Sequence, residues 1–233
     1  MTVQDSTRSS AGGVTPPDAV RRRSRRLGPA GLAVNHRIGG SMGLQERILR
    51  DDSHARGVLA ALRRGVSKSP GEIPEIWELT QVKVPDHADD EPTWEEIAVH
   101  TAMTLYAVHQ QSKPIRMFKP GDGLGRSARA LIGSPDNENP SARARFNALV
   151  TSATIAELQH HLRTFVSLLR AKEIPVDHAM LADDIVRFQR PGGAKTVQLR
   201  WARQYYSVPQ DSAAAPDSKS TDTSTSTTNP SEN

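Results

Sequence analysis

The stretch TIAELQHHLRTFVSLLR, residues 154–170, shows most directly how this chain folds. Thr154 and Glu157 have the spacing of a capping box, in which the Thr hydroxyl and the Glu carboxylate accept hydrogen bonds from free backbone N–H groups at a helix start. The apolar residues behind Thr154 recur every three or four positions, the spacing of one buried helical face. They are Ile155, Leu158, Leu162, Phe165, Val166 and Leu169. The stretch therefore predicts a long amphipathic helix.

Comparable helix starts occur elsewhere in the chain. Thr93 and Glu96 form a second capping-box pattern, and Asn139-Pro140 is typical of an N-cap followed by a first-turn proline. Further helices are predicted at 43–51, 54–64, 74–80, 124–132, 178–189 and 195–206. We find no pair of runs that alternate apolar and polar residues, and no Asn-Gly hairpin signal. The pattern predicts the all-α class, with about eight or nine helices.

The aromatic residues set the expected limits of the packed domain. All ten of them lie between Trp77 and Tyr206, and aromatic side chains bring large buried areas to a core. The segment after Tyr206 is rich in Ser, Thr and Asp, and the first 40 residues are rich in Gly, Pro, Ser and Arg. Such segments bury too little apolar surface to offset their ordering entropy. We expect a disordered basic arm at 1–40, a single compact helical domain at 41–208 and a disordered tail at 209–233.

Charge is distributed unevenly along the chain, although the formal net charge is only +4. Residues 41–100 carry more acidic than basic groups, whereas residues 101–208 carry about twice as many basic as acidic groups. The arm also holds Arg21, Arg22, Arg23, Arg25 and Arg26. This polarity would allow one part of the domain to face a polyanion.

Several functional classes find no support in the sequence. The chain has no cysteine, which excludes thiolate chemistry and disulfides and is compatible with a reducing compartment. It has neither an HExxH nor a GxSxG motif, and no stretch is apolar enough to span a membrane. His160 and His161 are adjacent and would point about 100° apart on a helix, so they cannot chelate one ion together. We expect Asp183 and Asp184 in exposed first turns. The sequence predicts no catalytic residue, metal or cofactor.

The basic residues are better candidates for a functional site. Lys119, Arg126 and Arg129 flank the glycine-rich segment GDGLG before a predicted helix, whose free N–H groups would suit a phosphate. Arg143 and Arg145 lie at a helix start, where the helix dipole disfavours cations, so an external anion would explain them. The remaining candidates are Arg63 and Arg64 at a helix end, and Arg163 and Arg170 two turns apart on one helical face.

Four stretches together resemble one family. They are AALRRG (60–65), GLGRSARAL (123–131), ARARFNALVTSATIAELQHHLRTFVSLLR (142–170) and LADDIVRFQ followed by VQLRWARQYY (181–206). In content and order they are similar to CasB, the small subunit of the type I-E CRISPR surveillance complex, Cascade. The resemblance covers roughly residues 44–206.

The resemblance implies a cytoplasmic, all-helical, non-catalytic subunit that is present in two copies. It would contact the backbone and large subunits of Cascade, together with the CRISPR RNA and the target DNA. Its basic surface would support the RNA–DNA hybrid and the displaced strand. Carried over to this chain, Arg63, Arg64, Arg126, Arg143 and Arg145 are the foremost candidates, followed by Arg129, Arg163 and Arg170, with Lys119 beside them. Position 144 is alanine, where relatives can carry another basic residue.

Two other functions stay open at this point. A stand-alone helical DNA-binding regulator would need base-reading side chains, for which only Gln159 and Gln198 are available. A hydrolase would need its aspartates or histidines, with Asp184 the first residue to test.

Overall fold

The computed structural model describes residues 26–83 and 90–207. Within them the chain forms ten α-helices: α1 Pro29–Ile38, α2 Leu44–Leu49, α3 Ser53–Arg64, α4 Trp77–Thr80, α5 Trp94–Gln110, α6 Leu124–Ile132, α7 Pro140–Val150, α8 Ile155–Ala171, α9 His178–Gln189 and α10 Gly193–Tyr206. Three short 3₁₀ turns, at Gly65–Ser67, Pro74–Ile76 and Pro135–Asn137, complete the described elements. The predicted all-α class is confirmed, and nine of these helices match predicted ones.

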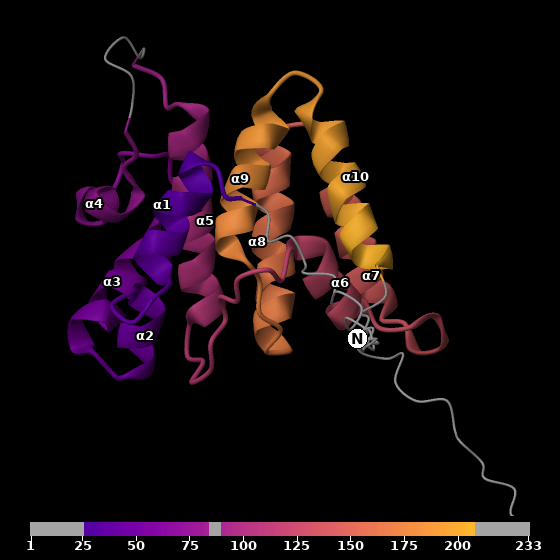
Figure 1. Cartoon of the computed structure of the whole chain (residues 1–233), viewed down its shortest axis with the longest axis horizontal. Helices are drawn as coiled ribbons and strands as arrows, with labels where there is room; N and C mark the ends of the chain where they lie inside the picture. The colour runs from indigo at the N-terminus through magenta and orange to yellow at the C-terminus, as the bar shows by residue number, and fades with distance from the viewer. Residues whose placement is uncertain (1–25, 84–89, 208–233) are drawn as a thin grey trace, which may run out of the picture.

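Helix α5 is the centre of the fold. Most of its residues are buried, among them three alanines that let neighbouring helices approach closely. It packs against α1, α3, α8 and α9. In Figure 1, α1 to α3 lie at one end of the long axis, α8 and α9 lie in the middle, and α6, α7 and α10 lie at the other end. One continuous apolar core runs through these helices.

The helix starts follow the predicted capping chemistry. Thr93 accepts from the N–H of Glu96, while the Glu96 carboxylate accepts from the N–H of Thr93, which makes a complete capping box. At α8, Thr154 accepts from the N–H of Glu157, but the Glu157 carboxylate accepts from Ala153 instead of the cap residue. Asn139 caps α7 through the N–H of Ala142, directly before Pro140.

The predicted boundary at residue 40 is too late. Helix α1 lies inside the expected arm, yet Ala30, Val34 and Ile38 are buried against α5 and α9. The helix was not predicted because its apolar face has only a few residues, and the segment around it is rich in Gly, Pro, Ser and Arg. The remainder of the predicted arm, up to residue 25, and the predicted tail lie outside the described residues.

Asp183 explains how α1 is held, and it corrects a second expectation. Asp183 and Asp184 are not exposed: their exposed fractions are 7% and 2%. The Asp183 carboxylate accepts from the N–H groups of Gly28 and Gly31 at 2.7 and 2.8 Å. A carboxylate at a helix N-terminus is favoured by the helix dipole, so α9 caps α1 from a distance of more than 150 residues in sequence.

Asp184 joins α9 to α10. Its carboxylate accepts from Trp201 Nε1 at 2.8 Å and from the Arg200 guanidinium. Trp201 is fully buried. The adjacent aspartates therefore fix two different helices, α1 and α10, to the same helix α9.

Candidate nucleic-acid interface

Eight of the nine predicted basic residues fall into two groups. We name them the α3–α8 group (Arg63, Arg64, Arg163 and Arg170) and the α6–α7 group (Lys119, Arg126, Arg129 and Arg143). Arg145 is exposed on α7 and forms no ion pair with any residue that the structure describes. Figure 1 places α3 and the α6–α7 pair at opposite ends of the long axis, with α8 between them. The fold thus brings the residues together in two places.

The α3–α8 group contains two neighbouring guanidinium groups. Burial first, and then the charge of Arg170, lower the pKa of Arg63. Arg170 donates to the side-chain oxygen of Gln111 at 2.8 Å, not to a carboxylate. A cleft of about 500 Å³ between α3 and the end of α5 is lined by Arg63 and Gln111, and also by Arg56 and Lys113. Asp51 lines it too and pairs with Arg56 at 2.6 Å, while Lys113 pairs with Glu173 at 3.0 Å. Two like charges held side by side without a carboxylate between them favour binding of an anion.

The other two members of this group lie at the 3₁₀ turn after α3. Arg163 donates to the carbonyl of Val66 at 2.9 Å, and its Nε is buried without a partner among the described residues. Arg64 is exposed and lies 3.5 Å from Glu75. Arg163 therefore has a structural role in tying α8 to this turn, while Arg64 stays accessible.

In the α6–α7 group, one carboxylate serves two cations. Lys119 Nζ lies 2.9 Å from Asp122, and Arg126 lies 3.5 Å from the same carboxylate. Arg126 also donates to the carbonyl of Gly121 at 2.8 Å. Both side chains are substantially exposed, so these ion pairs are weak and can exchange for a phosphate.

Arg143 has a partner that the sequence argument missed. Its guanidinium donates two hydrogen bonds to Glu138, at 2.8 and 2.9 Å, which raises the pKa of Arg143. It also lies over the Tyr205 ring, 4.8 Å from the centroid, and Arg129 approaches the same ring at 5.6 Å. Glu138 and Tyr205 therefore account for a cation at this helix start, and no external anion is needed to explain it.

The glycine-rich segment has a packing role. A Cβ on Gly125 would lie 2.1 Å from the Trp201 carbonyl, so only glycine allows α6 to approach α10 this closely. The N–H of Gly125 donates to Gln204, and the N–H of Gly121 donates to Asp177. Because these donors are occupied, the sequence argument for a phosphate at the start of α6 no longer holds. Only their charge now supports Lys119, Arg126 and Arg129 as candidate phosphate-binding residues.

A groove between α7 and α10 is a feature that the sequence pattern did not predict. It has a volume of about 400 Å³ and is bordered by the exposed ring of Tyr206. The doublet Tyr205-Tyr206 was the available signal, since adjacent residues on a helix point about 100° apart and cannot both enter the core.

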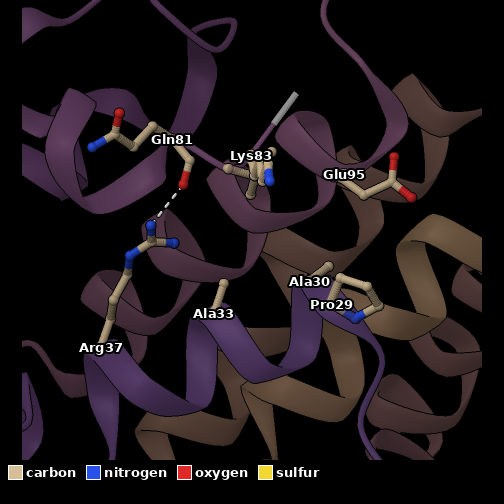
Figure 2. Close-up of a pocket in the computed structure, with 8 residues that line it drawn as sticks. Pro29, Ala30, Ala33, Arg37, Gln81, Lys83 and Glu95 are labelled. Atoms are coloured by element: carbon tan, nitrogen blue, oxygen red, sulfur yellow. Dashed lines mark hydrogen bonds between the residues drawn. The ribbon is translucent and has the colours of Figure 1, made fainter. Parts of the chain in front are cut away.

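Figure 2 shows another cavity, of about 500 Å³, between α1 and residues 81–83. Arg37 donates to the carbonyl of Gln81 at 2.6 Å on one side, and burial lowers the pKa of Arg37. Pro29 and two alanines lie along α1 below the cavity, while Glu95 stands opposite Arg37 (Figure 2). Its cations, Arg37 and Lys83, belong to neither of the two basic groups.

The buried histidines are bonded to one another and to the backbone. His109 Nδ1 lies 3.0 Å from His178 Nε2, and His109 Nε2 lies 3.0 Å from the Ile174 carbonyl oxygen. Burial lowers the pKa of His109 to about 4. Across residues 26–83 and 90–207, no three metal-ligating side chains come together, and no helix there has the length and hydropathy needed to cross a membrane.

The described part of the chain is thus a helical domain with two basic groups on its surface. The family model for the CRISPR-associated protein Cse2 matches residues 58–206. The fold is similar to that of CasB from Thermobifida fusca, with a TM-score of 0.66 and 33% identity, covering 78% of this chain and 100% of that one. The chain belongs to the Cse2 family of CRISPR-associated proteins, which confirms the resemblance drawn from the sequence.

Two other CasB structures are also similar. That from M. ruber has a TM-score of 0.55 and 25% identity, covering 78% of this chain and 94% of that one. That from Thermus thermophilus shares the fold, with a TM-score of 0.54 and 24% identity, covering 77% and 99% of the two chains. No curated protein sequence matches this chain.

Proposed function

We propose that this chain is the non-catalytic small subunit of a type I-E Cascade complex. It binds the sugar-phosphate backbone of the RNA–DNA hybrid and of the displaced DNA strand, and it stabilises the R-loop. Its partners are the CRISPR RNA, the target DNA, the backbone and large subunits, and a second copy of itself. Membership of the Cse2 family supports the assignment to a CRISPR system.

The adjacent Arg63 and Arg170 carry the proposal. Burial is the main cause of the lowered pKa of Arg63 and the charge of Arg170 adds to it, and a phosphate beside both groups would offset that repulsion. Guanidinium groups bind phosphate in a forked, two-bond geometry. In RNA-guided recognition, base pairing reads the sequence and the protein holds the backbone. Such a holder requires cations but no base-reading amides.

The side chains that a sequence-specific regulator would use are already engaged. Gln159 donates to the Thr101 hydroxyl at 2.8 Å, and Gln198 lies 3.4 Å from the Ser152 carbonyl. Both amides are partly buried between helices. This favours a backbone binder over a regulator that acts alone.

The salt dependence of binding should report the number of phosphate contacts. If about five arginines each neutralise one phosphate of a single strand, log K should fall with log salt with a slope of about −3.5. Affinity should then fall roughly 100-fold between about 50 and 200 mM salt. Titration of the full chain with labelled single-stranded DNA at several salt concentrations measures this slope. A slope near zero would contradict backbone binding.

Charge reversal of Arg63 and Arg170 tests the site itself. We expect the double variant R63E/R170E, assembled into Cascade, to hold the R-loop roughly tenfold less tightly and to reduce the salt slope by about 1.4, the share of two phosphates. The matched control is R187E/R190E, the same charge change at the exposed end of α9. An equal loss in both variants would show an effect of net charge alone, and an unchanged R-loop in R63E/R170E would refute the proposed site.

A further inference from the structure

The groove between α7 and α10 has the shape and lining of a site for a flat aromatic group. Phe146 and Val150 contribute its α7 wall, while Leu199 and Ala202 contribute its α10 wall. Tyr206 stands at its end and is 73% exposed, and Leu199 is 50% exposed. These two residues lie on α10, which is otherwise packed on α6 and α9, so their exposure leaves an apolar surface open to solvent.

The ring of Tyr206 is held in place by the core. Its ring meets the buried Tyr205 ring edge to face, with a centroid distance of 4.9 Å and an interplanar angle of 83°. Tyr205 in turn stacks on Phe146 at 5.5 Å and carries Arg143 over its face. Because Tyr205 is fixed from several directions, Tyr206 is a supported platform rather than a free side chain.

Cations surround this platform. Arg143 and Lys195 line the groove, and Arg203 lies three residues before Tyr206 and so on the same side of α10. Lys195 and Arg203 are exposed and have no ion pair within the described part of the chain. Glu138 already binds Arg143, and no carboxylate lines the groove among the residues that the structure describes.

We propose that this groove binds one unpaired nucleobase of single-stranded nucleic acid. The base stacks on Tyr206 above the apolar walls, and Arg203 binds a phosphate next to it. Lys195, about three turns away along α10, binds a phosphate farther along the strand. An aromatic ring beside cations is the common arrangement of single-strand binding sites, and it tolerates any base because every base has a flat face. The inference rests on the proposed function, to which it adds an unpaired strand as the ligand of this particular surface.

The charges favour a nucleic acid over a protein helix as the occupant. An apolar helix could fill the groove, but it would leave Lys195 and Arg203 without counterions. A phosphodiester chain supplies a negative charge on either side of each base. The groove is therefore complementary to a strand in both its apolar and its charged parts.

The test compares two oligonucleotides that share a backbone and differ in their bases. Fluorescence anisotropy of the full chain at low salt would measure binding to a labelled oligo(dT) and to the same strand made of abasic units. We expect roughly five- to tenfold tighter binding of the base-bearing strand. In Tyr206→Ala this difference should disappear, with binding of the abasic strand unchanged. Tyr206→Phe should retain it.

Trp77→Ala is the matched control, since Trp77 is an exposed aromatic residue on α4, outside the groove. It should leave the base-dependent difference intact. Equal binding of both strands by the unmodified chain would overturn the inference, while backbone binding would stand. Absence of binding to either strand would overturn the proposed function as well. If Tyr206→Ala keeps the difference but changes the oligomeric state in sedimentation, the groove is a protein contact and the inference is wrong.

Discussion

Replacement of Asp184 by alanine should lower the free energy of unfolding by about 3–5 kcal/mol, the usual cost of removing one partner from a buried ion pair. The Asp184 carboxylate is 2% exposed and accepts from both Arg200 and Trp201 Nε1. Its loss leaves the indole N–H of a fully buried Trp201 without an acceptor. The same change also removes the bond that fixes α10 to α9, and α10 carries the Tyr206 platform.

Urea denaturation followed by circular dichroism would measure this cost. Asp136→Ala is the matched control, because Asp136 is exposed in the turn before α7, and its loss should change stability by less than about 0.5 kcal/mol. Arg200→Gln should also be destabilising, since it leaves the Asp184 carboxylate, which is 2% exposed, without its positive partner. A loss below about 1 kcal/mol in Asp184→Ala would show that the carboxylate contributes little to holding α10.

The contrast between Asp183 and Asp184 shows where sequence reasoning ended. Local signals such as the Thr93 and Asn139 caps were readable because cap and helix lie within three or four residues. The partners of the two aspartates, Gly28 and Trp201, lie on other helices. The periodicity of one helix does not show whether a polar residue on its buried face can find a hydrogen-bond donor on another helix. The short α1 was missed for the same reason, as its stability comes from α5 and α9.

For the candidate site, the sequence predicted charges but not their partners. It identified Arg63 and Arg170 separately, and only the fold brings them together across α3 and α8. It offered an external anion as the reason for Arg143, whereas Glu138 and Tyr205 are the reason. The glycines near Arg126 suggest a phosphate loop, whereas Gly125 is required by the close approach of α10. Contacts between distant segments decided the first and third cases, whereas Glu138 is only five residues from Arg143 but lies before the helix start.

The buried pair His109 and His178 should make the fold sensitive to mild acid. His109 Nε2–H donates to the Ile174 carbonyl, which can only accept, so Nδ1 must accept from His178 Nε2–H. A proton added to Nδ1 would face that N–H. If His178 changed tautomer to accommodate it, the new N–H at Nδ1 would be buried, and that atom has no partner among the described residues. Both histidines are therefore held neutral.

The sign of the effect follows from the pKa values. Burial lowers the pKa of His109 to about 4, and Arg170 adds to this effect, whereas an unfolded histidine has a pKa of about 6.5. The unfolded state therefore binds more protons between these values, so stability should be complete above pH 6.5 and fall as the pH drops towards 4. His109 alone should account for a loss of about 3 kcal/mol. Burial and the neighbouring His109 also lower the pKa of His178, which acts in the same direction.

Denaturation midpoints across this pH range would measure the loss, with His160→Gln as the control because His160 is exposed on α8. That variant should keep the full pH dependence, whereas His109→Gln should flatten it even if its stability at neutral pH is lower. Should His109→Gln fold too poorly, NMR titration of the unmodified chain decides the matter, since the His109 ring should stay neutral at pH 5. Burial raises the pKa of Asp177, so the comparison with His109→Gln, and not the profile alone, assigns the effect to the histidines. Two results would contradict this prediction: a stability that does not change from pH 7 to 5, or a His109 ring that titrates near 6.5. Either would mean that water reaches the histidine pair and that α5 and α9 pack less tightly there.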